Sequence, residues 1–163
     1  MSATTQTSVE LGGMGQRVKR KEDARFIRGE GRFVDDIQLP GMLYMHLVRS
    51  PYAHARITGI DTSAAMEVPG VLTVITSEEL AEHDLDWMPT LMADQQMVLA
   101  TDRVLFQGQE VAAVIAESRY AAADGAEAVR VDYEELDVLV DPHRALDDDA
   151  PIVREDREEK SNH

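Results

Sequence analysis

The chain has 163 residues, which suits one domain, and its content of 44% hydrophobic residues excludes an intrinsically disordered chain. It contains no cysteine, which excludes disulfides, thiolate metal sites and cysteine nucleophiles within these residues and fits a cytoplasmic protein. The net charge of −15 argues against nucleic acid as a partner, because phosphate binding needs clustered positive charge, and no apolar run approaches the ~20 residues of a transmembrane segment.

The N-terminal part of the chain differs in charge from the rest. Residues 1–14 lack the basic region and long apolar core of a secretory signal, and we expect a flexible leader there. Residues 1–60 hold nine Lys/Arg and six Asp/Glu (net +3), whereas the remainder holds seven and twenty-five (net −18). The basic cluster at 17–32 lacks the interleaved aromatic residues of a single-strand stacking platform. Its RGEGRF stretch (28–33) has no third glycine and makes a poor phosphate loop.

The middle of the chain predicts strands separated by short helices. Apolar, β-branched and aromatic residues predict strands at 42–50, 55–61 and 71–76. Thr62 or Ser63 is expected to cap a short helix that ends at Pro69-Gly70, and Ser77 is expected to start a second helix.

Residues 82–101 predict a long loop with short ordered pieces. Pro89 and several polar residues interrupt its apolar residues, among them those of Trp87–Met92. Long loops in compact domains are often functional or interfacial. The 17–32 segment has a charge opposite to the overall sign, and the loop carries apolar residues, so we expect the 17–32 segment or the Trp87–Met92 stretch to contact another part of an assembly. The alternative is a solvated segment and a loop packed on its own domain.

Residues 104–117 read VLFQGQEVAAVIAE and are apolar except for the central Gln-Gly-Gln-Glu. They predict one interrupted strand, or two strand pieces that meet at Gly108, where glycine permits a bulge or a tight backbone approach. We expect Gln107 and Gln109 to bond to neighbouring backbone or to a subunit. Direct ligand contact is the less favoured alternative, because no other polar groups converge on this stretch.

The last third of the chain predicts one helix and two strands. Ser118 is expected to cap a helix over 119–130, in which small residues at helical spacing allow a close approach to a sheet. Residues 129–136 and 137–141 predict the final strands. Together the elements predict an α+β domain over residues 15–145, with a mixed β-sheet and short helices packed on it, followed by an acidic exit linker over 146–163.

We predict no catalytic, cofactor-binding or metal-binding residue within this chain. No two of the histidines have the close spacing of a metal site. Adjacent carboxylates on a strand point to opposite faces and form no converging acid–base pair. Methionine pairs would suit copper(I), but core packing or interface contact is favoured. The residues considered are His46, His54, His83, His143, His163, Asp35-Asp36, Glu134-Glu135, Asp147–Asp149, Met42, Met45, Met88 and Met92.

Whole segments of the chain resemble a known family. The first is GQRVKRKEDARFIRGEGRFVDDIQLPGMLYMHLVRSPYAHARITGID, and PGVLTVITSEEL and VLFQGQEVAAVIAESRYAAADGAEAVRVDYEELDVLVDP follow it. They are similar to the N-terminal α/β hammerhead domain of the large molybdenum-binding chain of the xanthine oxidase family. Within this family, the stretch DLDWMPTLMADQQMVLATDRVLFQGQEVA resembles the members that oxidise carbon monoxide.

The resemblance implies an oxidoreductase that oxidises CO with water to CO2. It implies molybdopterin cytosine dinucleotide with Mo and Cu, bound outside this segment. It also implies two partner subunits, an iron–sulfur small subunit that carries 2Fe-2S and a medium subunit that binds FAD. The remainder of the large chain would be a further partner, in a cytoplasmic dimer of heterotrimers that could associate with the inner face of the membrane. The alternatives are an aldehyde or N-heterocycle as substrate, and a non-catalytic scaffold module.

Overall fold

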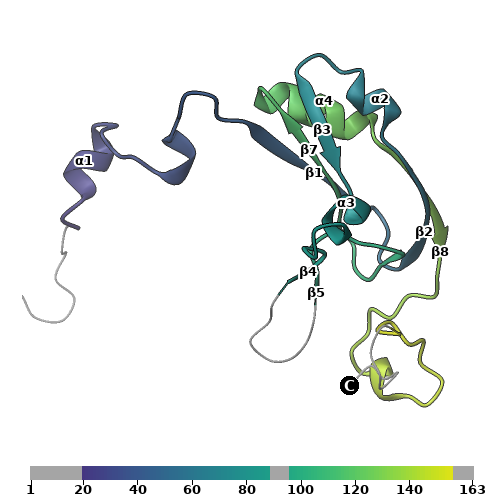
Figure 1. Ribbon diagram of the computed structural model, residues 1–163. Helices are drawn as coiled ribbons and strands as arrows, with labels where there is room; N and C mark the ends of the chain where they lie inside the picture. Colours follow the sequence, from purple (N-terminus) through teal and green to yellow (C-terminus); the bar gives the residue numbers. More distant parts are fainter. Residues whose placement is uncertain (1–19, 89–95, 156–163) are drawn as a thin grey trace, which may run out of the picture. The chain divides into compact units, whose positions relative to one another are not determined.

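The computed structural model describes residues 20–88 and 96–155 (Figure 1). The chain divides into two compact units, Met1–Pro40 and Gly41–His163. The predicted leader of residues 1–14 lies outside the described residues.

The described part of the first unit, residues 20–40, contains two short helical segments with no buried residue. The α-helix α1 spans Asp23–Ile27 and the 3-10 helix η1 spans Val34–Asp36. Local contacts define both segments. The Arg20 backbone N–H donates to the Asp23 carboxylate at 3.0 Å, the Phe33 N–H donates to the Asp36 carboxylate at 2.9 Å, and the Phe26 and Phe33 rings stack at 5.4 Å.

A three-stranded sheet forms the centre of the second unit (Figure 1). Its strands are β1 (Tyr44–Arg49), β7 (Glu110–Ala116) and β3 (Val71–Ile75), in the order β1-β7-β3. Both pairings are antiparallel. Five of the seven residues of β7 are fully or nearly fully buried, as its continuous apolar sequence predicts for a central strand.

The helix α4 (Arg119–Ala128) packs on one face of this sheet, together with α2 (Ser63–Met66). The Ser118 hydroxyl accepts a hydrogen bond from the Ala121 N–H at 3.1 Å, which confirms the predicted cap. A β-carbon built on Gly125 would lie 2.7 Å from Val71 Cγ2 and 2.9 Å from Val114 Cγ1. Only glycine therefore allows the helix to approach the sheet this closely.

A second sheet contains β6 (Arg103–Val104), β2 (Ala55–Asp61) and β8 (Arg130–Glu135), in the order β6-β2-β8. The predicted strand at 137–141 is wrong, because no part of it is extended in a sheet. In the antiparallel register Ala55 pairs with Glu135, so the chain beyond β8 has run past the start of β2 and has no strand to pair with.

The remaining elements are short. The predicted loop at 82–101 contains a small hairpin of β4 (Trp87–Met88) and β5 (Gln96–Met97), while residues 89–95 lie outside the described residues. The helix α3 spans Ser77–Ala81, and the 3-10 helix η2 spans Arg144–Leu146 within the predicted exit segment. Among the described residues, none of the helices combines the length and apolar character needed to cross a bilayer.

The α+β class with short helices packed on sheet is confirmed. Where a single mixed sheet was expected, the described strands form two three-stranded sheets and one hairpin, and their pairings are antiparallel. Ile60 of β2 and Val131 of β8 pack against both of the larger buried clusters, so the two sheets share one apolar interior.

Candidate functional site

The Gln-Gly-Gln turn is where the chain passes from one sheet to the other. Residues 105–109 connect β6 with β7, so the prediction of two strand pieces is confirmed and the pieces belong to different sheets. Gly108 has φ +88°, in the left-handed region that favours glycine. A β-carbon built on it would meet no atom within 4 Å, so the predicted tight backbone approach is wrong and the turn conformation alone requires glycine.

Gln109 holds this turn together from inside. It is 5% exposed, and its side-chain oxygen accepts a hydrogen bond from the Leu105 N–H at 2.6 Å. The backbone of the turn is bound to Ser50, whose N–H donates to the Gln109 carbonyl and whose carbonyl accepts from Gly108, both at 2.9 Å. The expected bond from Gln109 to neighbouring backbone is confirmed. Gln107 is exposed.

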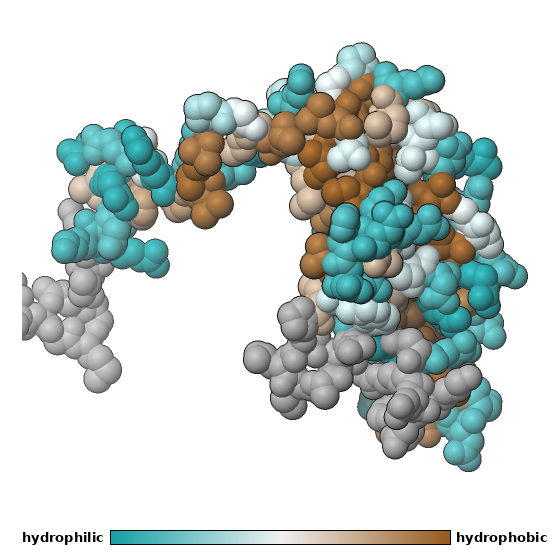
Figure 2. Space-filling model, viewed as in Figure 1, coloured by the Kyte–Doolittle hydropathy of each residue, from teal (hydrophilic) through white to brown (hydrophobic). Residues whose placement is uncertain are grey.

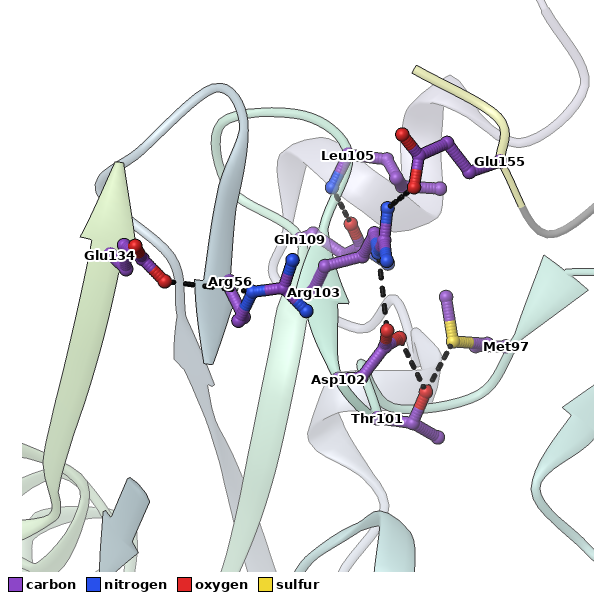
Figure 3. Close-up of polar contacts among 9 residues, drawn as sticks. All are labelled: Arg56, Met97, Thr101, Asp102, Arg103, Leu105, Gln109, Glu134 and Glu155. Atoms are coloured by element: carbon purple, nitrogen blue, oxygen red, sulfur yellow. Dashed lines mark hydrogen bonds and ion pairs between the residues drawn. The ribbon is translucent and has the colours of Figure 1, made fainter. Parts of the chain in front are cut away.

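Arg103 lies at the centre of a charged cluster beside this turn (Figure 3). Its Nε donates to Asp102 at 3.1 Å and its terminal nitrogen donates to Glu155 at 2.7 Å, with only 15% of the side chain exposed. The hydrogen bond with Glu155, followed by that with Asp102, raises the pKa of Arg103 above its ordinary value. The guanidinium is therefore a permanent cation that fixes two carboxylates.

A hollow of about 380 Å³ lies next to Arg103. It is bounded by apolar residues from the short hairpin and by the charged cluster, and Thr101 donates a hydrogen bond to the Met97 sulfur at 3.1 Å within it. Its lining residues are Trp87, Met97, Thr101, Asp102, Arg103, Leu105 and Glu155. Asp102 and Glu155 of the same chain accept the hydrogen bonds that Arg103 donates in Figure 3. These donors are therefore not free to bind an anionic ligand in the hollow.

A second hollow, of about 320 Å³, is lined by β2 and the start of α3. Its polar groups are the side chains of Thr62, Thr76, Ser77 and Glu79, among others. Thr76 and Glu79 form a capping box, in which the Thr76 hydroxyl and N–H both donate to the Glu79 carboxylate. The hydrogen bond from the Thr76 hydroxyl is the main cause that lowers the pKa of Glu79. Thr76 and Glu79 therefore cap the start of α3, and they do not form a nucleophile–base pair.

The histidines are dispersed. His54 is 6% exposed and its Nδ1 lies 2.7 Å from the Asp137 carbonyl, so its ring fixes the chain just beyond β8. Its Nε2 has no hydrogen-bond partner among the described residues. His46, His83 and His143 are exposed, and His163 lies outside the described residues.

Carboxylates and methionines are equally scattered. Asp36 caps η1, and Glu134 pairs with Arg56 at 3.6 Å on the surface of β8 (Figure 3). Met45 is 61% exposed on β1. Within the described ranges, no three His, Asp or Glu side chains are grouped closely enough to hold a metal ion. Asp35, Glu135 and Asp147–Asp149 are exposed, Met42 is half-buried, Met88 is exposed, and Met92 lies outside the described residues.

The two segments expected to contact an assembly are described in part. Residues 20–32 of the basic segment carry exposed apolar as well as basic side chains, with Ile27 84% exposed. Trp87 and Met88 are exposed by 39% and 38%. Residues 17–19 and 89–92 lie outside the described residues. The sequence analysis did not predict the ion pair between Arg103 and Glu155. The two residues are 52 positions apart, and no local sequence pattern indicates that they pair.

Comparison with known proteins assigns the fold. A family model described as the a/b hammerhead domain of aldehyde oxidase and xanthine dehydrogenase matches residues 28–137. The chain belongs to this family. The match covers both three-stranded sheets and α4, and the predicted family resemblance is confirmed.

Individual relatives of this hammerhead domain are much longer chains. It is 56% identical to the carbon monoxide dehydrogenase large chain of Afipia carboxidovorans, over 93% of this chain and 19% of the relative. It is 43% identical to the nicotine 6-hydroxylase large subunit of Paenarthrobacter nicotinovorans, over 82% of this chain and 17% of the relative. The crystal structure of a Cu,Mo-CO dehydrogenase in its carbon monoxide reduced state matches with a TM-score of 0.80 and 57% identity, over 88% of this chain and 18% of that chain.

Proposed function

We propose that this hammerhead domain is the N-terminal domain of the large subunit of a molybdenum-dependent carbon monoxide dehydrogenase. The complete enzyme would oxidise carbon monoxide with water to carbon dioxide and pass two electrons to partner subunits. The observation that carries the proposal is the 56% identity to a carbon monoxide dehydrogenase large chain over 93% of the residues, against 43% to the nicotine 6-hydroxylase. The domain spans about a fifth of that large chain, so the whole enzyme's activity rests on sequence beyond the match.

The residues present do not fit the metal centre. Copper(I) prefers soft thiolate ligands, and the sequence has no cysteine. The described residues also bring together no group of three histidines or carboxylates that could hold a metal ion. We therefore place molybdopterin cytosine dinucleotide, Mo and Cu in the rest of the large chain. The family resemblance implies 2Fe-2S and FAD on partner subunits.

The role proposed for this domain is structural. Several of its described polar side chains are used in caps, turns and ion pairs within the chain, as at Thr76, Gln109 and Arg103. In this proposal the domain spans residues 15–145, and residues 146–163 lead toward the rest of the chain. The complete protein would be a cytoplasmic dimer of heterotrimers with small iron–sulfur and medium FAD subunits, and any contact with the inner face of the membrane would be made through partners.

The test is an assay of the complete gene product, coexpressed with its partner subunits and loaded with molybdenum and copper. We expect carbon monoxide to reduce an artificial electron acceptor, with carbon dioxide as the product. A fully loaded complex that leaves carbon monoxide unoxidised would refute the proposal. The same preparation should be offered aldehydes and N-heterocycles, because the 43% identity to nicotine 6-hydroxylase favours an N-heterocycle as the second candidate substrate.

The non-catalytic scaffold module predicts a different outcome. A reading frame that ends at residue 163, without a gene for a molybdenum-binding partner, would support it against both enzymatic alternatives. An intact large-subunit reading frame would exclude it. The sequence of the gene therefore separates these alternatives before any assay is made.

A further inference from the structure

The sheet β1-β7-β3 has one face that α4 does not cover. Val114 of β7 points toward the helix, because a β-carbon on Gly125 would lie 2.9 Å from its Cγ1. Successive residues of a strand point to opposite faces, so Ala113 and Ile115 point away from α4. Their cross-strand partners complete two rows, Leu47–Ala113–Ile75 and Met45–Ile115–Thr73. We call these six residues the open sheet face.

The open sheet face has the composition of an interior surface. Five of its six side chains are apolar and none is charged. Met45 is 61% exposed and Thr73 is exposed, Leu47, Ile75 and Ile115 are partly exposed, and Ala113 on the central strand is buried, with 6% exposure. Figure 2 shows apolar side chains gathered over this sheet. A solvated face of an antiparallel sheet ordinarily carries polar residues, as the alternation of apolar and polar residues requires. The open sheet face is instead apolar like the face that packs on α4.

A second copy of this chain suits the open sheet face poorly. These 163 residues carry a net charge of −15, so two copies of the domain repel each other. The uncharged rows offer no cation to offset that repulsion. A neutral, apolar segment would bury the face without this cost.

The relatives are much longer than this domain, and their additional residues can provide such a segment. The domain corresponds to 18% of the chain in the Cu,Mo-CO dehydrogenase structure and to 19% of the Afipia carboxidovorans large chain, so about four fifths of each lies outside the match. We infer that the open sheet face is the docking surface for an uncharged, apolar segment of that same large chain. The inference rests on the proposed function, because it requires the domain to be part of a large subunit.

Methionine oxidation tests the inference on the unmodified complete protein. Three methionines of the domain report on exposure: Met45 on the open sheet face, Met66 on α2 with 47% exposure, and Met97 in the interior with 8% exposure. Hydrogen peroxide is added, and the oxidation rate of each methionine is measured by mass spectrometry and divided by its rate in the unfolded protein. We expect Met45 and Met97 each to be oxidised about fivefold or more slowly than in the unfolded protein. Met66 shows the rate of an exposed methionine of the domain. Protection of Met45 below this level overturns the inference.

A photo-crosslinking amino acid at position 45 then identifies the partner. Crosslinks to residues of the same gene product outside positions 1–163 support the inference. Crosslinks to another subunit, or to positions 1–163 of any copy, overturn it. Neither measurement needs turnover, so a protein that fails to oxidise carbon monoxide still tests the docking surface. Failure of the docking surface likewise leaves the carbon monoxide assay to be decided separately.

Discussion

The Arg103 guanidinium donates to the Glu155 carboxylate at 2.7 Å and thereby binds β6 to a residue 52 positions later in the chain. Arg103 also holds Asp102, so one largely buried cation joins two carboxylates. The pairing fixes part of the acidic segment that follows the second sheet. It shows that this segment is attached to the domain at a defined point before residue 156.

We expect Glu155→Gln to loosen that attachment. The loss of one partly buried ion pair corresponds to about 1 kcal/mol, or about fivefold faster local opening. Hydrogen exchange of the backbone amides of residues 144–155, measured in the complete protein, checks this. The matched control is Asp149→Asn, which neutralises an exposed carboxylate of the same segment and should leave the exchange rates unchanged. Equal rates in Glu155→Gln and the native protein would contradict the attachment.

Gly108 gives a prediction about backbone conformation alone. Since a β-carbon there meets no atom within 4 Å, Gly108→Ala introduces no clash and tests only the φ of +88°. We expect a loss of about 1–2 kcal/mol in the free energy of unfolding, and a smaller loss for Gly108→Asn, because asparagine adopts left-handed backbone more readily. Thermal or denaturant unfolding measures both variants. Equal effects of the two substitutions would show that conformation is not the cause.

Gly125 gives the complementary prediction about space. Gly125→Ala places a β-carbon 2.7 Å from Val71 Cγ2, and we expect overpacking to cost about 1–3 kcal/mol. Alanine's better helix propensity offsets up to about 1 kcal/mol of this. Gly59→Ala is the control, since its β-carbon would have only Asp132 Oδ2 near it, at 3.9 Å. The expected result is a lower melting temperature for Gly125→Ala than for Gly59→Ala.

The capping box of α3 predicts a pH dependence. The hydrogen bond from the Thr76 hydroxyl lowers the pKa of Glu79 in the folded protein, so the carboxylate contributes stability above its ordinary pKa. That contribution is lost as the pH falls through the lowered pKa, below about pH 4. We expect Glu79→Gln to destabilise the protein at pH 7 and to have less effect at pH 3. Unfolding measured at both values checks this.

Thr76→Ala removes the other side chain of the same capping box. Loss of an N-cap side chain typically costs about 1 kcal/mol. The double variant Thr76→Ala/Glu79→Gln should lose less than the sum of the two single variants, because each residue binds the other. Additive losses would contradict a coupled capping box.

Periodicity and capping were sufficient to predict most elements of this domain. The strand at 55–61 was predicted to the residue, and Ser118 was the correct cap for α4. Both features depend on local sequence, where side-chain alternation or a hydroxyl before a helix is decisive. The strand at 137–141 failed because its apolar alternation is also local, whereas a strand requires a partner that β2 no longer provides there.

The long-range features were beyond local patterns. Nothing in the Gln-Gly-Gln motif indicates that its two ends enter different sheets, because that depends on which strands β6 and β7 pair with. Gly108 was identified as special, but the choice between the reasons given, a bulge or a close backbone approach, required knowledge of its neighbours. The Arg103–Glu155 pair and the open sheet face likewise became visible only once distant residues were in place.

The strand order β1-β7-β3 has a consequence for protein synthesis. The central strand is the last of the three to be translated, so β1 and β3 lack their partner until Glu110–Ala116 has left the ribosome. During that interval the nascent chain carries two apolar strands with unpaired backbone edges, which are prone to aggregate. The emergence of β7 therefore ends the interval in which the two outer strands of this sheet are unpaired.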